Sequence, residues 1–187
     1  MRKIISFMHM SLDGFVSGPN GELSWAKVDE ELFDHVGQRI GKGDTALYGR
    51  VTYQMMEAYW PTAADKPDAS KHDIEHSKWY KDVHKVVLSK TLTGSSNMEV
   101  ISENLSDRIN ELKQQDGEDI LVFGSPTATR ALIEQNLIDG YWIFLNPILL
   151  GQGTPLFVGS KDTEKLKLLS TKKFTNGVIE LNYIIEK

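Results

Sequence analysis

Short apolar runs alternate with longer amphipathic segments along most of the chain, a pattern typical of a parallel sheet whose strands are connected by helices. The apolar runs predict strands at 4–10, 44–49, 84–89, 99–102 and 119–124, and a further apolar run covers 141–150. We predict helices over 28–40, from Val51 to a stop at Pro61, over 104–115 and over 126–136. The polar stretch 62–72 is expected to form a surface loop.

The C-terminal region changes to a β-rich pattern. Two β-like runs, 166–174 and 178–186, flank Asn176-Gly177, and this dipeptide is the strongest short-range signal for a tight hairpin. We therefore predict an α/β fold, a three-layer sandwich with a mostly parallel central sheet that ends in an antiparallel C-terminal hairpin. A chain of 187 residues is long enough for one core, and we expect a single domain over 1–187.

Three of the predicted strands end in small or basic polar residues. These are Gly49, Arg50 and Thr52 after one strand, Ser89 and Lys90 after the next, and Gly124, Ser125, Pro126 and Thr127 after a third. Open α/β sheets bind ligands beyond the carboxyl ends of their strands, so the three ends indicate one extended phosphate-bearing ligand, most economically a dinucleotide. The two cations favour NADP(H), with its extra phosphate, over NAD(H). Because the Gly-x-Gly-x-x-Gly fingerprint is missing, a nicotinamide site here would be of another type.

Each of these segments also has a simpler interpretation. Residues 124–127 can be an ordinary strand-to-helix turn with Ser125 as the N-cap. Arg50 can be a solvated surface charge, and Ser89-Lys90 can simply end a strand. The three junctions taken together favour the ligand-binding interpretation.

Acidic residues near the start of the 28–40 helix are candidates for proton transfer. On a helical wheel Asp29 falls within the arc of apolar residues, so its carboxylate would face inward, where it could donate a proton or anchor an amidine-like edge of a heterocycle. The alternative is that Asp29 is the helix N-cap and that Glu30 and Glu31 fill the first turn. We interpret His9 as a core histidine and the 72–76 segment as a solvated helix rather than a metal site.

Composition and charge exclude several function classes. The chain contains no cysteine, which excludes disulfides, thiolate metal sites and a cysteine nucleophile. A net charge of −5 argues against a nucleic-acid partner. The N-terminal apolar run is too short for a signal segment, and no run has membrane-spanning length. We expect a cytoplasmic protein with a small-molecule ligand, no membrane partner and no bound metal.

Six short stretches form an ordered set across most of the chain: Ser11-Leu-Asp-Gly14, Leu47–Tyr53, Tyr59-Trp-Pro61, Val87–Lys90, Phe123-Gly-Ser125 and Pro147–Phe157. Together they resemble the dihydrofolate reductase-like superfamily, particularly the branch that contains the reductase domain of bacterial riboflavin biosynthesis. The resemblance implies NADPH along the strand ends, held by the three junctions described above, and hydride transfer to a pterin- or pyrimidine-like heterocycle. The chain departs from the family at Ser125, where a second glycine is common, and at Gly140, where an acid is common. The missing acid weakens the case for the riboflavin-pathway reaction itself.

The resemblance also bears on the substrate side of the site. Asp13 and Trp25 would bind substrate, together with Asp29 or Glu30. In true dihydrofolate reductases an acid follows the early tryptophan by five residues, which selects Glu30 after Trp25, whereas the helical wheel selects Asp29.

Two functions stay open at this point. The first is an NADPH-dependent reductase of the dihydrofolate reductase or 5-amino-6-(5-phosphoribosylamino)uracil reductase type. The second is a non-catalytic NADP(H)- or nucleotide-binding protein that kept the cofactor groove. We also expect a homodimer, because Tyr141–Leu145 offers more apolar and aromatic surface than a peripheral strand needs. The alternative is that this run is a central strand.

Overall fold

The structure is a computed structural model that describes residues 1–158 and 163–186, so positions 159–162 and 187 of the predicted domain lie outside the described residues. Its strands are β1 (Ile4–Ser11), β2 (Phe15–Ser17), β3 (Thr45–Gly49), β4 (His84–Leu88), β5 (Met98–Ile101), β6 (Ile120–Phe123), β7 (Gly140–Asn146), β8 (Thr154–Pro155), β9 (Leu166–Lys173) and β10 (Ile179–Ile185). Its helices are α1 (Glu30–Ile40), α2 (Arg50–Ala63), α3 (Lys71–Asp82), α4 (Leu105–Gln114) and α5 (Pro126–Glu134).

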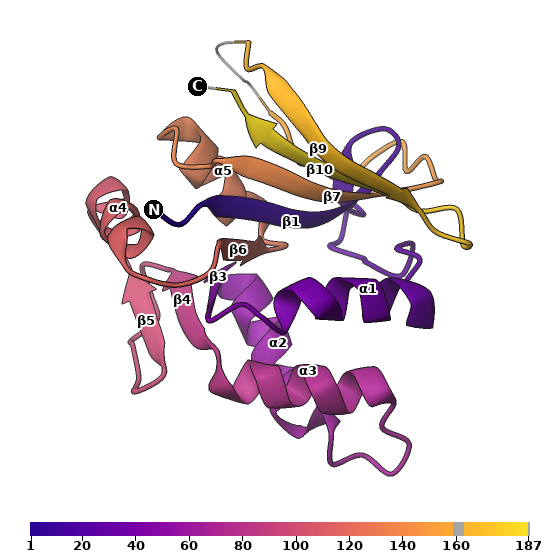
Figure 1. The fold of residues 1–187 in the computed structure, drawn as a ribbon, viewed down its shortest axis with the longest axis horizontal. Helices are drawn as coiled ribbons and strands as arrows, with labels where there is room; N and C mark the ends of the chain where they lie inside the picture. The colour runs from indigo at the N-terminus through magenta and orange to yellow at the C-terminus, as the bar shows by residue number, and fades with distance from the viewer. Residues whose placement is uncertain (159–162, 187) are drawn as a thin grey trace.

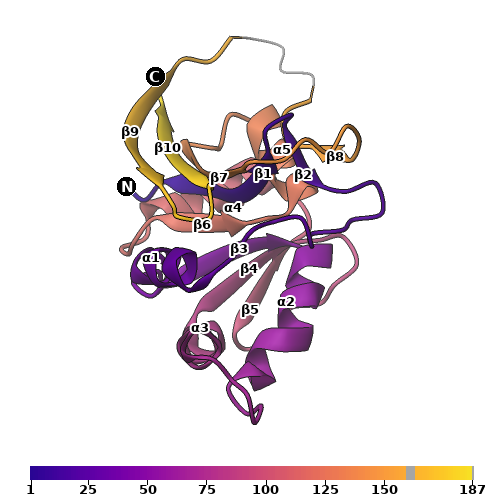
Figure 2. The same ribbon diagram turned by 90° about the vertical axis from the view of Figure 1, so that its right-hand side faces the viewer.

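Eight strands form one central sheet in the order β5-β4-β3-β6-β1-β7-β10-β9 (Figure 1). All neighbours from β5 to β7 pair in parallel, and the antiparallel pairs of this sheet are β7 with β10 and β10 with β9. Apolar side chains of α1, α2 and α3 pack on one face of the sheet, and those of α4 and α5 pack on the other. Figure 2 shows the sheet between these two helical layers. The predicted three-layer α/β fold with an antiparallel C-terminal hairpin is therefore confirmed.

The position of β6 creates the main irregularity of the sheet. From β3 the chain continues outward to β4 and β5, and it then returns to place β6 between β3 and β1. Since α2 follows β3 on one face and α5 follows β6 on the other, the first turns of these two helices diverge at neighbouring strand ends. This is the arrangement at which open α/β sheets form ligand-binding crevices.

Several predicted boundaries differ from the structure for identifiable reasons. Pro61 does not stop α2, which runs on to Ala63, because a proline so near the end of a helix removes only one of its last hydrogen bonds. The stretch predicted as a loop ends earlier than expected, at Ser70, which forms a capping box with Asp73 and starts α3. The two-stranded sheet of β2 and β8 was not predicted, because strands this short show no alternation of apolar and polar residues.

The aromatic run that suggested a homodimer lies inside the molecule. Tyr141–Leu145 belongs to β7, which pairs with β1 on one side and with β10 on the other, and Trp142 and Phe144 are fully buried. The run is thus a central strand, and the argument that it offers apolar surface for a dimer interface was wrong. Dimerisation stays a prediction without this argument. In the part of the chain that the structure describes, no helix combines the length and apolar character needed to cross a membrane.

The two histidines of α3 pack in an aromatic cluster instead of facing solvent. The His76 ring lies 4.0 Å from the Trp60 ring and 4.9 Å from the Trp79 ring, and His72 stacks on Phe33 at 3.7 Å, measured between ring centroids. Burial, and to a smaller extent the neighbouring His72, lowers the pKa of His76 from 6.5 to about 3. The helix was predicted correctly, but its expected solvation was wrong.

A depressed histidine pKa makes stability depend on pH. Because the unfolded chain binds a proton near pH 6.5 and the folded protein does not, stability is complete above that pH and falls as the pH drops toward 3. His76→Phe keeps an aromatic ring in the cluster and removes the titrating group. We expect the wild type to lose up to about 2 kcal/mol more than this variant between about pH 7.5 and about pH 5.

Urea unfolding at both pH values measures this difference. Lys78→Ala, an exposed substitution on the same helix, is the matched control and should keep the wild-type pH dependence. Identical pH dependence of wild type and His76→Phe would contradict the prediction.

Candidate functional site

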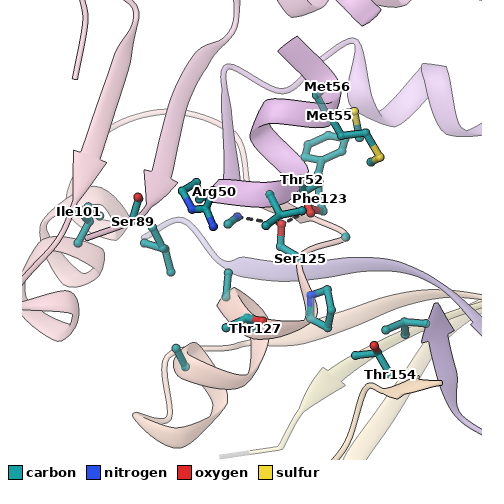
Figure 3. Close-up of a pocket in the computed structure, with 18 of the residues that line it drawn as sticks. Arg50, Thr52, Met55, Met56, Ser89, Ile101, Phe123, Ser125, Thr127 and Thr154 are labelled. Carbon is teal, nitrogen blue, oxygen red and sulfur yellow. Dashed lines mark hydrogen bonds between the residues drawn. The ribbon is translucent and has the colours of Figure 1, made fainter. Parts of the chain in front are cut away.

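One large pocket of about 1130 Å³ lies across the carboxyl ends of β1, β3, β4, β5 and β6 (Figure 3). The residues predicted to bind the cofactor come from three separate strand ends, and all of them line this pocket. They are Gly49, Arg50, Thr52, Ser89, Lys90, Gly124, Ser125, Pro126 and Thr127. The structure therefore brings together every residue that was selected because it follows an apolar strand.

The helices that start at this pocket share an unusual feature, since none has a side-chain cap. The first residues of α2, α4 and α5, which are Arg50, Leu105 and Pro126, line the pocket, and no side chain accepts a hydrogen bond from the free N–H groups in their first turns. By contrast, α1 and α3 start away from the pocket and are capped by Asp29 and Ser70. Uncapped N-termini leave backbone donors and a positive dipole end directed at the pocket, which suits an anionic ligand.

Ser125 connects the ends of β3 and β6. Its hydroxyl accepts a hydrogen bond from the Gly49 backbone N–H at 2.8 Å and donates to the Phe123 carbonyl at 2.9 Å. The residue has a φ of 56°, in the left-handed region, and is buried. Ser125 is the N-cap residue of α5, as the simpler interpretation expected, but its hydroxyl bonds between the strands instead of capping the helix and donates its proton to the Phe123 carbonyl.

The two cations of the pocket have no carboxylate partner among the described residues. The guanidinium of Arg50 is exposed and contacts only the Gln54 side chain, through Nη1 at 3.0 Å. Lys90 is exposed as well. Ser89, next to it, accepts hydrogen bonds from the N–H groups of Thr91 and Leu92, so its hydroxyl also shapes the turn. Unpaired cations beside uncapped helix ends make this part of the pocket strongly attractive to phosphate.

Asp13 and Trp25, which were predicted to bind substrate, do not line the pocket. The Asp13 carboxylate accepts hydrogen bonds from Ser11 Oγ at 2.6 Å, from the Gly151 N–H at 2.7 Å and from the Leu150 N–H at 3.1 Å. These bonds hold the pKa of Asp13 below its ordinary value. Asp13 thus joins the loop after β1 to the segment after β7. The indole N–H of Trp25 donates to a neighbouring backbone carbonyl.

Neither candidate acid of α1 lines the pocket. The helix begins at Glu30, and Asp29 precedes it with extended backbone and accepts a hydrogen bond from the Leu32 N–H at 3.0 Å. The helical-wheel argument fails because Asp29 lies outside the helix, so the angle of about 100° between adjacent helical residues does not apply to it. Glu30 is exposed in the first turn. The alternative interpretation of Asp29 as the N-cap is the one that the structure shows.

His9 lines the pocket, although it was interpreted as a core histidine. It lies near the carboxyl end of β1, the central strand, and burial lowers its pKa from 6.5 to about 4, so the ring is neutral near pH 7. The neighbouring wall is apolar and includes Phe7, Met55, Met56 and Phe123. The signal that could have identified His9 was its place at a strand end, the same signal that selected the cofactor segments.

Two substitutions of Ser125 separate its hydrogen bonds from its backbone conformation. Ser125→Ala leaves the Gly49 N–H without its acceptor, and we expect a loss of about 1–3 kcal/mol in the free energy of unfolding. Ser125→Gly loses the same bond but relieves the left-handed conformation, so it should be more stable than the alanine variant by about 1 kcal/mol. Urea unfolding measures both, with Thr127→Ala as a control on the same helix. An alanine variant as stable as the wild type would refute the role of the hydroxyl.

Comparisons with known proteins agree with this arrangement. The family model of the RibD C-terminal domain matches residues 2–180. The uncharacterized protein YyaP of Bacillus subtilis is 33% identical over 186 residues, which cover 97% of this chain and 94% of that protein. The uncharacterized protein YwjB of the same organism is 26% identical over 184 residues and 98% of each chain.

Solved structures show the same fold. A putative riboflavin biosynthesis protein from Shewanella sp. PV-4 superposes with a TM-score of 0.71 at 22% identity, over 99% of each chain. A deaminase/5-amino-6-(5-phosphoribosylamino)uracil reductase from Thermotoga maritima superposes with a TM-score of 0.67 at 12% identity, over 99% of this chain and 57% of the longer one. The fold, the pocket at its strand ends and the match over nearly the whole length lead to one assignment: the chain belongs to the RibD C-terminal domain family.

Proposed function

We propose that this protein is an NADPH-dependent reductase that transfers hydride to a flat heterocycle of the pterin or pyrimidine type. The observation that carries the proposal is the contrast between capped and uncapped helices, because the helix starts at the pocket are the uncapped ones. A pocket of about 1130 Å³ with this donor set has room for a dinucleotide and a second small molecule. Membership of the RibD C-terminal domain family supports the same activity.

The residues present fit NADPH at the edge formed by β3, β4 and β6. Free N–H groups in the first turns of α2 and α5 would donate to the pyrophosphate. Gly124 adopts a φ of 51°, which favours glycine, and its lack of a side chain lets the backbone approach the ligand. Arg50 and Lys90 would pair with the additional phosphate. Ser125 would be a positioning residue, because its hydroxyl holds the ends of β3 and β6 together.

When bound, NADPH supplies the hydride, and the protein contributes binding, orientation and exclusion of water. Apolar side chains of α2 and β6 would face the reacting ring, with Met55, Met56 and Phe123 as part of this wall. An apolar wall lowers the local dielectric and strengthens the few polar contacts within it.

The alternative is a non-catalytic NADP(H)-binding protein, and one observation favours it. The carboxylates predicted to donate a proton, Asp29 and Glu30, do not line the pocket, and Glu103 at the start of α4 is the one carboxylate among its described lining residues. Binding of NADPH without turnover of any heterocycle would support this alternative.

Turnover is tested with a panel of dihydropterins and aminopyrimidine ribose phosphates. We expect at least one of these compounds to be reduced, with a loss of NADPH absorbance that is stoichiometric with product. Thr52→Tyr, which would fill the pocket beside Gly124, should abolish the reaction and is the matched negative control. A full panel without turnover, in the presence of measured NADPH binding, would overturn the reductase proposal.

Cofactor preference is tested by calorimetry. We expect tighter binding of NADPH than of NADH, and Arg50→Ala and Lys90→Ala should each weaken NADPH binding by roughly tenfold to a hundredfold, because each removes a charge-assisted contact worth about 1.5–3 kcal/mol. NADH binding should change less. Lys78→Ala, an exposed cation on α3 that does not line the pocket, is the control. Equal affinities of the wild type for the two cofactors would contradict the proposal.

A further inference from the structure

Asn146, the last residue of β7, is buried and has a fixed amide orientation. Its Oδ1 accepts a hydrogen bond from the Lys27 backbone N–H at 2.8 Å. A backbone N–H can only donate, so the oxygen must lie on this side of the amide and the nitrogen on the other. The nitrogen Nδ2 donates to the Phe144 carbonyl at 3.0 Å and lies 3.4 Å from Nδ1 of His9.

This orientation determines which nitrogen of His9 carries the proton. Because Nδ2 of Asn146 is a donor, His9 Nδ1 must accept from it. A neutral imidazole has one N–H group, so in His9 this group is at Nε2. The neutral form prevails near pH 7 because burial depresses the pKa of His9.

The ring of His9 is also held in place by packing. It stacks on Phe144 with 5.3 Å between ring centroids and meets the edge of Phe7 at 6.2 Å. No hydrogen bond to Nε2 exists within residues 1–158 and 163–186, and Nε2 is not among the fully buried polar atoms that lack a partner. His9 lines the pocket, so Nε2–H is a fixed donor available to a ligand there.

Among the described residues that line the pocket, no cation lies in the part around His9. We call this part the apolar end and define it by Phe7, His9, Met55, Met56 and Phe123. Among the described residues that line the pocket, the cations are Arg50 and Lys90, which follow β3 and β4. Figure 3 shows Arg50 on the side of Ser89, with Met55 and Met56 beyond Thr52. A phosphate group placed at the apolar end would lose its hydration without gaining a cationic partner.

We propose that a carbonyl oxygen or ring nitrogen of the substrate heterocycle accepts a hydrogen bond from His9 Nε2 at this apolar end, with Asn146 as the positioning residue that sets the tautomer. The inference rests on the proposed function and deepens it by naming the group of the heterocycle that the site recognises. His9 thereby selects for an acceptor group on the substrate edge, since an edge with only a donor would leave two donors facing each other.

The tautomer is tested by nitrogen–proton NMR spectra of the histidine rings in the whole protein. We expect His9 to carry its proton on Nε2 near pH 7. In Asn146→Asp, the carboxylate can still accept from Lys27 but cannot donate to His9, so the proton should move to Nδ1. A wild-type His9 with its proton on Nδ1 would overturn the inference without any knowledge of the substrate.

Ligand recognition is tested with neopterin, titrated calorimetrically into protein saturated with NADP+. We expect neopterin to bind. His9→Phe keeps the stacked ring and deletes the donor, so neopterin affinity should fall about tenfold, or about 1.4 kcal/mol, with NADPH affinity unchanged. Asn146→Asp should produce a similar loss, and His84→Phe should produce none.

The outcomes separate this inference from the proposed function. Failure of the wild type to bind NADPH would overturn the proposed function. Normal NADPH binding combined with no neopterin binding, or with full neopterin affinity in His9→Phe, would overturn only the inference. Unchanged NADPH affinity in the variants shows that they are folded.

Discussion

The insertion of β6 between β1 and β3 is the constraint on which the rest of the molecule depends. It brings the ends of β3 and β6 together while their helices leave toward opposite faces of the sheet. At such a junction the two strand ends must stay in contact while the two helices separate beyond them. The Ser125 hydroxyl meets the first requirement by bonding to both strand ends. The diverging first turns of α2 and α5 meet the second, and the space between them becomes the pocket.

The helices that start at the pocket lack a side-chain cap, whereas α1 and α3, which start elsewhere, have one. At α1 and α3, the side chains of Asp29 and Ser70 each accept a hydrogen bond from an N–H group of the first turn. At the pocket the same groups remain available, at a cost in folding stability that a bound anion would offset. The absence of acidic residues from the first turns of α2 and α5 is consistent with this division, because a local carboxylate would compete with a ligand.

The residues that the strand ends bring to the pocket could be predicted from the sequence, whereas the positions of Asp13, Trp25 and Asp29 could not, for physical reasons. The end of a buried strand is a local pattern, and parallel strands bring their ends to one edge, so residues such as Arg50 and Gly124 were placed correctly without any tertiary information. The function of Asp29 depended on a helix boundary exact to one residue. The contacts of Asp13 depended on a partner segment more than a hundred residues away.

The same distinction applies to the fold. Long apolar runs and the Asn176-Gly177 turn act locally, and the strands and the hairpin that they predict are present. The burial of Tyr141–Leu145 between β1 and β10 is a property of strand order, which apolarity alone does not determine. The strand that carries His9 could be predicted from the sequence, but the contact of His9 with the Asn146 amide on another strand could not.

The hydrogen bonds that the Asp13 carboxylate accepts have a consequence for which positions of this fold can change during evolution. The Asp13 carboxylate accepts three hydrogen bonds, and together with the bond from the Leu156 N–H to the Gly14 carbonyl they attach the rim segments, which carry Val16 and Thr154 at the pocket, to the end of the sheet. Because none of these bonds uses the side chain of Val16 or Thr154, these two side chains can be exchanged without loss of the attachment. A lineage built on this scaffold can therefore acquire new substrates by rim substitutions while the edge formed by β3, β4 and β6 is inherited unchanged.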